Sequence, residues 1–418
     1  LAYLGHSRAE FFAMLFGCAK AGLILVPLNW RLAVPELETL VEDCEPGALI
    51  FGAEFADAAD QLQQRCGPLT LVALEPAKQG ADGAPHDYQA DLADTAPDLS
   101  AQPDKDPDTP WYLLYTSGTT GRPKGVVQTF RMMLANYLNI GLAVNLNGDD
   151  VLLNVLPLFH TAGINLYSSA VFMVGGSVLV ARAFDPDQAL QVLEERATIF
   201  FGVPAVYQAL LDHPHFSGDR LRQVRSWGCG GAPLSLPVAQ QYVDQGIRVR
   251  TGMGMTETGP TVFLLDEDKV LDKIGSVGRP QLLTEVRIVD HDGRDVPQGE
   301  AGELLIRGPN ITPGYWNRPD ATADAIRADG WLHSGDVARC DEDGQYFIVD
   351  RSKDMYISGG ENGVHADQDA PDPEALRVFC REQLAGYKVP KVFEQVEALP
   401  RNALGKVTKQ ELRDHAKQ

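Results

Sequence analysis

The sequence predicts an α/β protein: a large layered α/β amino-terminal domain that includes a β-rich subdomain, followed by a small α+β domain. Helix-like and strand-like segments alternate from residue 1 to about residue 75 and again from about residue 151 to residue 235. Short strands and tight turns dominate from about Lys273 to Asp350. A charged turn and one helical pattern, "DPEALRVFCREQL", follow. We therefore expect two domains, residues 1–350 and 351–418.

Composition restricts the class of protein. The 418 residues are 44% hydrophobic and 22% charged, which is typical of a large globular protein with a sizeable core. The net charge of −21, without a basic tract, argues against nonspecific binding to nucleic acid or to an anionic membrane. The cysteines form no CxxC pair, which disfavours a zinc site or a disulfide framework and favours reduced thiols in a cytoplasm. They are Cys18, Cys44, Cys66, Cys229, Cys340 and Cys380.

The first long apolar run, "FFAMLFGCAKAGLILVPLNW", resembles a membrane span in length only. Lys20 and Pro27 interrupt it, so we expect two buried elements and no integral membrane segment. Ser7 and Glu10 fit a capping box, which predicts a helix to about Lys20, and "LILVPLN" predicts a strand. The chain opens on a strand-like "AYLG" without a methionine, so we expect that an amino-terminal part is missing.

Residues 76–110 are acidic and rich in Pro, Gly and Ala, which predicts a long surface excursion.

The strand-like "WYLLYT" then leads into "YTSGTTGRPKG", residues 115–125. A linker should not leave a buried strand, and a Walker loop needs Gly directly before Lys, whereas Lys124 follows Pro123. Glycines that turn backbone amides inward, hydroxyl donors and a lysine favour another kind of phosphate loop. An ordinary turn of small residues stays open as the alternative.

Four further segments carry suitable chemistry. "GMGMTETG" places Thr256 beside Glu257, a hydroxyl and a carboxylate of the kind that a magnesium triphosphate needs. "HSGD" places Asp336 after a turn, where its two oxygens can accept from a ribose diol. "GGAPL" at 230–234 offers bare backbone to an adenine ring, and "PRNALGKVTK" places Lys406 on a glycine turn. Taken singly, these are more often a polar turn, a cap, a loop and a solvated lysine.

In this order, and over nearly the whole chain, the segments resemble the adenylate-forming superfamily, above all its fatty-acid and coumarate-type CoA ligases. The resemblance implies an AMP-forming acyl-CoA synthetase that uses ATP and Mg²⁺ to convert a fatty or aryl carboxylic acid to an acyl-adenylate. Coenzyme A then takes the acyl group. The resemblance also implies that the small domain, residues 351–418, is a mobile lid. The resemblance implies that the protein binds small molecules and no nucleic acid, and it is compatible with a homo-oligomer.

The resemblance assigns roles to individual residues. It implies a catalytic group of Lys406, Thr256, Glu257 and His160, with Glu257 also the metal ligand. It implies cofactor contacts at Thr116, Ser117, Gly118, Thr119, Thr120, Gly121, Lys124, Gly231, Ala232, Pro233, Met253, Asp336, Arg351, Gly359 and Gly360. Lys353 corresponds to the hinge of the lid.

His160 indicates which class of carboxylic acid is the substrate. Peptide-synthetase domains have an aspartate there that pairs with the substrate ammonium, and an unprotonated imidazole cannot replace it, so an amino acid is disfavoured. Gly228, Gly230 and Gly252 leave room for an apolar tail or ring. Met253 stands where many relatives have a tyrosine over the adenine, and a thioether can still cover a ring. A packed core histidine, a ligase that loads a carrier protein, and a noncatalytic nucleotide-binding relative remain alternatives.

The tail departs from the family pattern directly after "SGGEN". We expect residues to be absent from the sequence between Asn362 and Gly363 and near Gln368 and Asp369, because the stretch is too short for the family's small domain. The intact mass of the natural protein should then exceed that of these 418 residues. A mass equal to theirs would contradict this expectation.

Overall fold

The computed structural model describes residues 1–75, 86–96, 106–116, 123–351, 372–384, 389–390 and 393. Two compact units divide the chain: Leu1–Trp30 with Leu37–Met355, and Arg31–Glu36 with Tyr356–Gln418. Most of the second unit lies outside the described residues, so the fold is presented for the first unit, apart from one helix, α11 (Pro373–Gln383), which confirms the helix expected in the tail.

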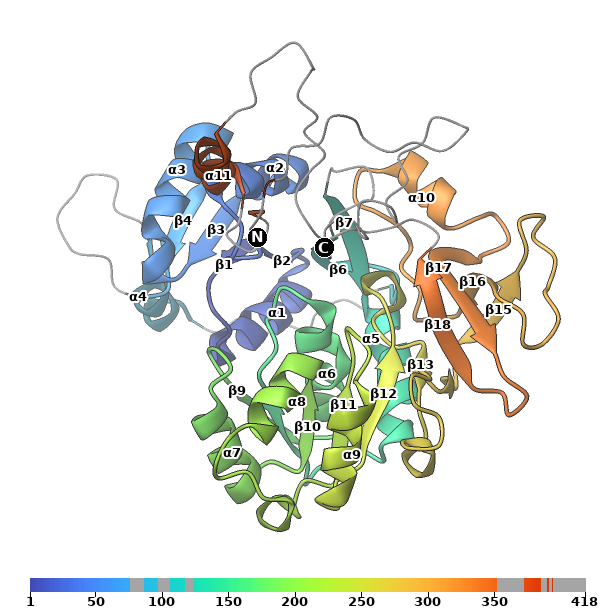
Figure 1. Ribbon diagram of the computed structural model, residues 1–418. Helices are drawn as coiled ribbons and strands as arrows, with labels where there is room; N and C mark the ends of the chain where they lie inside the picture. The colour runs from blue at the N-terminus through green and yellow to red at the C-terminus, as the bar shows by residue number, and fades with distance from the viewer. Residues whose placement is uncertain are drawn as a thin grey trace. The chain divides into compact units, whose positions relative to one another are not determined.

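The first sheet is parallel, with the strand order β2-β1-β3-β4-β5, drawn in blue in Figure 1. Its strands are β1 (Ala2–Leu4), β2 (Val26–Pro27), β3 (Ala48–Phe51), β4 (Thr70–Ala73) and β5 (His86–Asp87). The helices of this region are α1 (Ala9–Ala21), α2 (Val34–Cys44), α3 (Ala56–Cys66) and α4 (Tyr88–Asp94).

The described part of the expected surface excursion, residues 86–96, is mostly exposed, and His86 pairs with Val72 of β4 at the edge of the sheet. One local prediction is wrong. The expected capping box is absent from α1, because Ser7 Oγ donates instead to the Leu156 carbonyl oxygen at 3.4 Å, and the helix begins at Ala9 after an extended Arg8. A long-range contact overrides the local pattern here.

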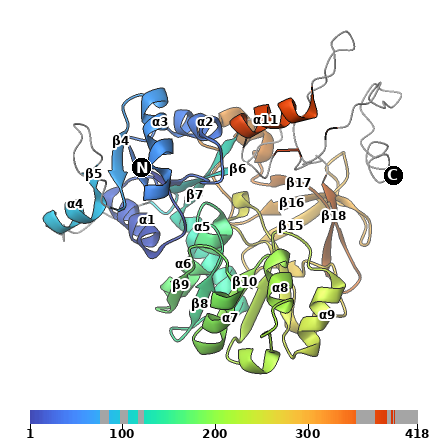
Figure 2. The same cartoon turned by 60° about the vertical axis from the view of Figure 1, so that its left-hand side comes forward.

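A hairpin of β6 (Pro110–Thr116) and β7 (Lys124–Thr129) follows, and it leads into α5 (Phe130–Asn136) and a π-helical turn, η2 (Tyr137–Gly141). Phe11 of α1 and Trp111 of β6 belong to one buried cluster, against which Phe130 of α5 and Phe172 of the later α6 (Ser168–Met173) also pack. Figure 2 shows α1, α5 and α6 between the five-stranded sheet and the next sheet.

The second sheet has seven strands in the order β14-β13-β12-β11-β10-β8-β9, and the run from β12 to β9 is parallel. The strands are β8 (Val151–Asn154), β9 (Ser177–Val180), β10 (Ile199–Gly202), β11 (Ser226–Cys229), β12 (Val249–Met253), β13 (Phe263–Leu264) and β14 (Arg279–Pro280). A buried cluster packs α7 (Pro186–Glu195), α8 (Pro204–Leu211) and α9 (Leu236–Asp244) on one face. The turn η2, a second π-helical turn, η3 (Ala162–Leu166), and α6 share another cluster with β8 and β10.

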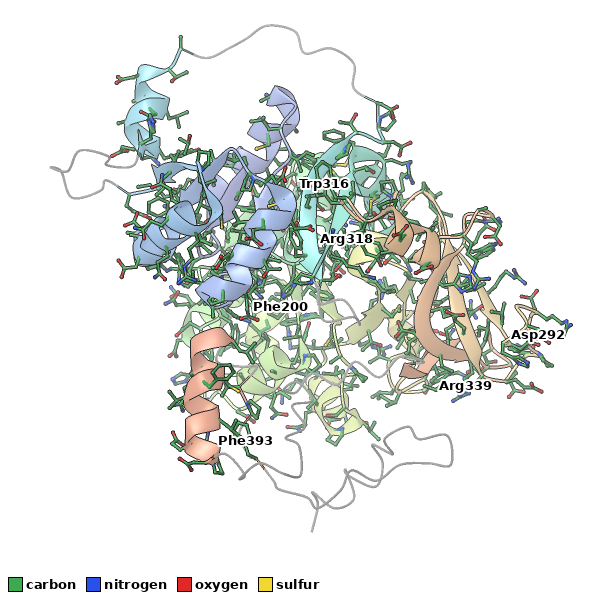
Figure 3. All side chains as sticks on the ribbon, turned by 90° about the horizontal axis from the view of Figure 1, so that it is seen from above. Phe200, Asp292, Trp316, Arg318, Arg339 and Phe393 are labelled. Atoms are coloured by element: carbon green, nitrogen blue, oxygen red, sulfur yellow. The ribbon has the colours of Figure 1, made fainter. Side chains whose placement is uncertain are left out.

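The third sheet is the β-rich part, antiparallel in the order β15-β16-β17-β18. It comprises β15 (Glu285–Val289), β16 (Gly302–Arg307), β17 (Leu332–Cys340) and β18 (Tyr346–Arg351), and α10 (Pro319–Ala325) precedes β17. Figure 3 shows Asp292, in the turn after β15, at the outer end of this sheet.

Layered α/β architecture with a β-rich subdomain is therefore confirmed. Within the described ranges, no helix is both long and apolar enough to cross a membrane.

Asp150 ties together the amino ends of four parallel strands. Its carboxylate accepts from Arg225 Nε at 2.9 Å and from Thr198 Oγ1 at 2.8 Å, and its carbonyl oxygen accepts from the Ser177 N–H at 2.8 Å. Burial opposes the charge, but the hydrogen bonds from Arg225, the Asn147 N–H and Thr198 hold the pKa of Asp150 below its usual value. This contribution to stability is present above the unfolded-state pKa and is lost as the pH falls through the folded-state pKa.

Replacing Asp150 with Ala should lower the free energy of unfolding by about 3 kcal/mol at neutral pH, because a buried ion pair loses one partner. Urea unfolding followed by circular dichroism measures this. Asp149→Ala, at the exposed neighbouring position, is the matched control and should change stability by less than about 0.5 kcal/mol. Equal effects of the two variants would contradict the role of Asp150.

Candidate functional site

A cavity of about 680 Å³ lies at the carboxyl ends of the central strands of the seven-stranded sheet. Phe201 of β10, Cys229 of β11 and Met253 of β12 line it. Crevices outside the carboxyl ends of parallel strands are the usual ligand sites of α/β proteins. The cavity brings together eight of the residues predicted from the sequence: Thr116, Lys124, His160, Gly231, Met253, Thr256, Glu257 and Asp336.

The other predicted residues fall into two groups. Ala232 and Pro233 follow Gly231 on an exposed loop and do not line the cavity, while Arg351 ends β18 with its backbone in register with Asp336. The second group lies outside the described residues: Ser117, Gly118, Thr119, Thr120, Gly121, Lys353, Gly359, Gly360 and Lys406.

Thr116 and Lys124 mark the two ends of the predicted phosphate loop. They are cross-strand partners in the β6–β7 hairpin, and both line the cavity. Residues 117–122 of the predicted phosphate loop lie outside the described residues. The hairpin register holds the Lys124 backbone at the cavity wall.

The loop from Gly254 to Thr261 carries Thr256 and Glu257 on a single 3₁₀ turn. Four of its carbonyl oxygens accept from buried amide side chains, and the Glu257 carbonyl oxygen accepts from the Thr312 N–H at 2.9 Å. Gln128 Nε2 donates to Thr256 at 2.9 Å, and Asn310 Nδ2 donates both to Thr258 at 3.0 Å and to Thr261 at 2.9 Å. Asn165 Nδ2 donates to the Gly259 carbonyl oxygen.

We call Gln128, Asn165 and Asn310 the amide clamp. All three are at most 1% exposed, and the sequence analysis did not identify them. A signal was present, since each interrupts an otherwise buried pattern: "VVQTF", "GINLY" and "GPNIT". Buried amides of this kind need hydrogen-bond partners, and here the partners are the carbonyl groups of the loop.

Gly254 permits the tight path of this loop. A Cβ atom at position 254 would lie 1.4 Å from the Pro260 carbonyl oxygen, a separation that no side chain tolerates. The loop therefore doubles back on itself at Gly254, and this close approach presents Thr256 and Glu257 to the cavity.

Glu257 is only 9% exposed, and its Oε1 accepts from the Tyr315 hydroxyl at 2.9 Å. Burial, and next the Glu257 carboxylate, raise the pKa of Tyr315 well above its usual value, so the phenol stays protonated and donates. Lys124 Nζ lies 5.0 Å from the centroid of the same ring. Sequence analysis missed Tyr315, although "PGYW" marks a turn with two aromatic residues.

The charged residues fit a metal that arrives with a triphosphate. Mg²⁺ commonly takes one or two protein carboxylates and completes its shell with phosphate oxygens and water. Glu257 supplies a carboxylate, with the Thr256 hydroxyl beside it in the cavity wall. Within the described part of the chain, no group of three or more His, Cys, Asp or Glu residues forms a complete metal site.

Asp336 contributes a second carboxylate to the cavity. It lies on β17, is 3% exposed, and its N–H donates to Ser334 Oγ at 3.1 Å. Nearby on the wall, His333 Nδ1 lies 3.1 Å from Glu303 Oε2. A buried carboxylate with two acceptor oxygens suits a vicinal diol.

Part of the cavity wall is apolar, and we call this part the apolar end. It includes Ile140, Leu166, Tyr167, Phe201 and Leu264, which pack in one hydrophobic cluster, together with Phe263. A Cβ atom on Gly228 would lie 2.8 Å from Phe201 Cδ2 and 3.3 Å from the Tyr167 hydroxyl, so these two side chains, rather than open space, lie against the glycine. Burial raises the pKa of the Cys229 thiol to about 12. His160 is exposed on the turn before η3 and lines the cavity.

Comparison with known proteins agrees with this geometry. The family model described as "AMP-binding enzyme" matches residues 1–316. A feruloyl-CoA synthase of Amycolatopsis is 38% identical over 99% of this chain and 88% of its own length. An indoleacetate–CoA ligase of Aromatoleum aromaticum is 33% identical, with coverages of 99% and 87%. The o-succinylbenzoate CoA synthetase of Bacillus subtilis, solved with a product analogue, superposes with a TM-score of 0.81 at 26% identity, covering 99% and 88%.

Gly254→Ala should disrupt the loop, because the backbone must move to relieve the clash with Pro260. We expect a loss of about 2 kcal/mol in the free energy of unfolding, or more, together with weakened nucleotide binding. Denaturant unfolding and calorimetric titration with ATP measure the two effects. Gly17→Ala, in an exposed helical position with nothing within 4 Å of the added methyl group, is the control and should leave both quantities unchanged or slightly raise stability. If the Gly254 variant matched this control, the close approach would have no structural role.

Proposed function

Since the chain belongs to the AMP-binding enzyme family, we propose that it uses ATP to activate a hydrophobic carboxylic acid and transfers the acyl group to CoA. One observation carries the proposal. A single cavity joins a polar end, with Lys124, Thr256, Glu257 and Asp336, to an apolar end that can take an uncharged organic group. Such a cavity suits a reaction that couples an apolar acid to a nucleotide.

In the first half-reaction, a carboxylate oxygen of the acid forms a bond to the α-phosphorus of ATP, and pyrophosphate leaves. Both reactants are anions, so positive charge must offset their repulsion. Lys124 would bind the phosphates that leave, Asp336 would hold the ribose hydroxyls, and Lys406 would bridge the carboxylate and the α-phosphate. A Mg²⁺ ion bound at Glu257 would supply further positive charge to the triphosphate.

The polar groups mainly fix geometry. Asp336, Lys124 and Thr256 all line the cavity, so Asp336 would orient the nucleoside while Lys124 and Thr256 contact the phosphates. Holding two reactants in line removes most of the entropic cost of their encounter. No protein nucleophile is required, because the acid itself is the nucleophile.

In the second half-reaction, the thiol of CoA attacks the acyl carbonyl carbon, and AMP leaves. Gly359 and Gly360 would form part of the passage for the pantetheine arm of CoA. Lys353 would be the hinge of the small domain, and Arg351 would contact the nucleotide. Lys406 must withdraw before that passage can form, since one cleft cannot hold both. Closure steps of this kind separate the two halves of a reaction and exclude water.

The acid that we favour is an aryl carboxylic acid. Tyr167, Phe201 and Phe263 give the apolar end flat aromatic walls, which stack on rings. Feruloyl-CoA synthase and indoleacetate–CoA ligase, by their names, act on aryl acids, which supports the choice. His160, which lines the cavity, lacks the fixed negative charge of the aspartate that pairs with a substrate ammonium in peptide-synthetase domains, which disfavours an amino acid.

Release of AMP from ATP and Mg²⁺, measured across hydroxycinnamic, indolic and fatty acids with and without CoA, tests the function. AMP that forms with aryl acids and rises with CoA supports it. AMP release that ignores CoA would indicate a carrier-protein thiol as acceptor. No turnover with any acid would indicate a noncatalytic nucleotide-binding protein.

Lys406→Ala should slow acyl-adenylate formation by about 100-fold or more, the usual effect of removing a charge that stabilises a transition state. Thioester formation from supplied acyl-adenylate should change less than about threefold, because Lys406 has withdrawn at that stage. Pyrophosphate release and acyl-CoA formation report the two steps. Lys409→Ala, in the same short segment, is the control. Equal losses in both half-reactions would rule out this assignment.

A further inference from the structure

Tyr315 contacts the two charged groups that face each other in the polar end of the cavity. Its hydroxyl donates to Glu257 Oε1 at 2.9 Å, and Lys124 Nζ lies 5.0 Å from its ring centroid. Lys124 and Glu257 both line the cavity, yet among the ion pairs of the described residues none joins them. A ring with a hydroxyl group thus stands between an ammonium and a carboxylate.

The backbone holds this tyrosine in place from two sides. The Val127 N–H donates to the Gly314 carbonyl oxygen at 3.1 Å and the Trp316 N–H donates to the Gly125 carbonyl oxygen at 2.7 Å, which attaches the segment to β7 like an added strand. The Tyr315 N–H donates to Thr322 Oγ1 of α10 at 2.9 Å. Figure 3 shows Trp316 beside β7, in agreement with the first pair of bonds. The ring therefore has little freedom to leave the cavity.

Direct pairing of lysine and glutamate would be the default without this ring. Opposite charges in a partly buried cavity attract strongly, and a closed ion pair would neutralise both groups before any ligand arrived. Tyr315 offers each group a neutral partner instead. The hydroxyl hydrogen-bonds the carboxylate, and the ring face attracts the ammonium through a cation–π interaction. Neither contact joins the ammonium to the carboxylate, so each group can still accept a ligand of opposite charge.

We propose that Tyr315 is a positioning residue that keeps the Glu257 carboxylate and the Lys124 ammonium apart and oriented, so that they can receive a divalent cation and a triphosphate. The inference rests on the proposed function and deepens it by adding a residue to the polar end. The Tyr315 hydroxyl would orient Glu257 for the divalent cation. The Tyr315 ring would orient Lys124 for the phosphates.

Two substitutions separate these statements. Tyr315→Phe removes only the hydroxyl, so the Mg²⁺ concentration that gives half-maximal activity should rise about tenfold, while the KM for ATP at saturating Mg²⁺ stays within about twofold. Tyr315→Leu removes the ring as well, so the KM for ATP should also rise about tenfold. In both variants, the fold decrease of kcat at saturating ATP and Mg²⁺ should be smaller than the fold increase of the half-maximal Mg²⁺ concentration. The reason is that Tyr315 does not contact the reacting atoms.

Tyr242→Phe is the matched control. It also loses one buried tyrosine hydrogen bond, from its hydroxyl to the Tyr207 carbonyl oxygen at 2.9 Å, in the core under α8 and α9. Its Mg²⁺ and ATP dependence should equal that of the wild type. If Tyr315→Phe behaved like this control, or if it lowered kcat without moving the Mg²⁺ dependence, the positioning role would be refuted.

Acid-dependent AMP release by the wild-type protein, measured first, separates this inference from the proposed function. If the wild type turns over no acid, the proposed function fails, and the inference is then read from calorimetric binding of ATP with Mg²⁺ alone. Binding that requires about tenfold more Mg²⁺ in Tyr315→Phe supports the inference in either case. Binding equal in wild type, Tyr315→Phe and Tyr315→Leu overturns it.

Discussion

The hydrogen bonds of the amide clamp to the loop from Gly254 to Thr261 are the interaction on which the site depends. This loop has one short turn, and the carbonyl groups of Thr258, Gly259 and Thr261 accept from the amide clamp; leaving such a buried carbonyl unsatisfied costs about 1–3 kcal/mol. Gln128, Asn165 and Asn310 reach it from three separate segments of the chain. The loop is thus the point at which the hairpin, the seven-stranded sheet and the β-rich part are joined.

The two edges of the seven-stranded sheet serve different purposes. At the amino edge, Asp150 and Arg225 bind the strand ends to one another and contribute to stability. At the carboxyl edge, β10 ends on Gly202, β11 on Cys229 and β12 on Met253, and the loops beyond these strands contribute to the cavity wall. A site built at the carboxyl edge can therefore tolerate strained loops, because the opposite edge holds the strands in register.

Much of the site could be predicted from the sequence because its signals are local. The phosphate loop, "GMGMTETG" and "HSGD" each place their chemistry within a few residues, and Thr116, Thr256 and Asp336 do reach one cavity. The amide clamp and Tyr315 were missed because their partners are remote. Gln128 and Thr256 are 128 residues apart, and Tyr315 and Glu257 are 58 apart. The capping box at Ser7 was predicted wrongly for the same reason, since its hydroxyl bonds to a residue 149 positions away.

The low polarity around Cys229 affects how readily its thiol can react with an activated acyl group. An acyl-adenylate is a mixed anhydride that acylates any good nucleophile within reach, and a thiolate would be the most dangerous neighbour. Cys229 lies in the cavity wall, but a pKa of about 12 keeps its sulfur protonated at neutral pH. The same apolar packing that accommodates the acid therefore protects the protein from acylating itself, and leaves the activated acyl group for the thiol that enters from solution.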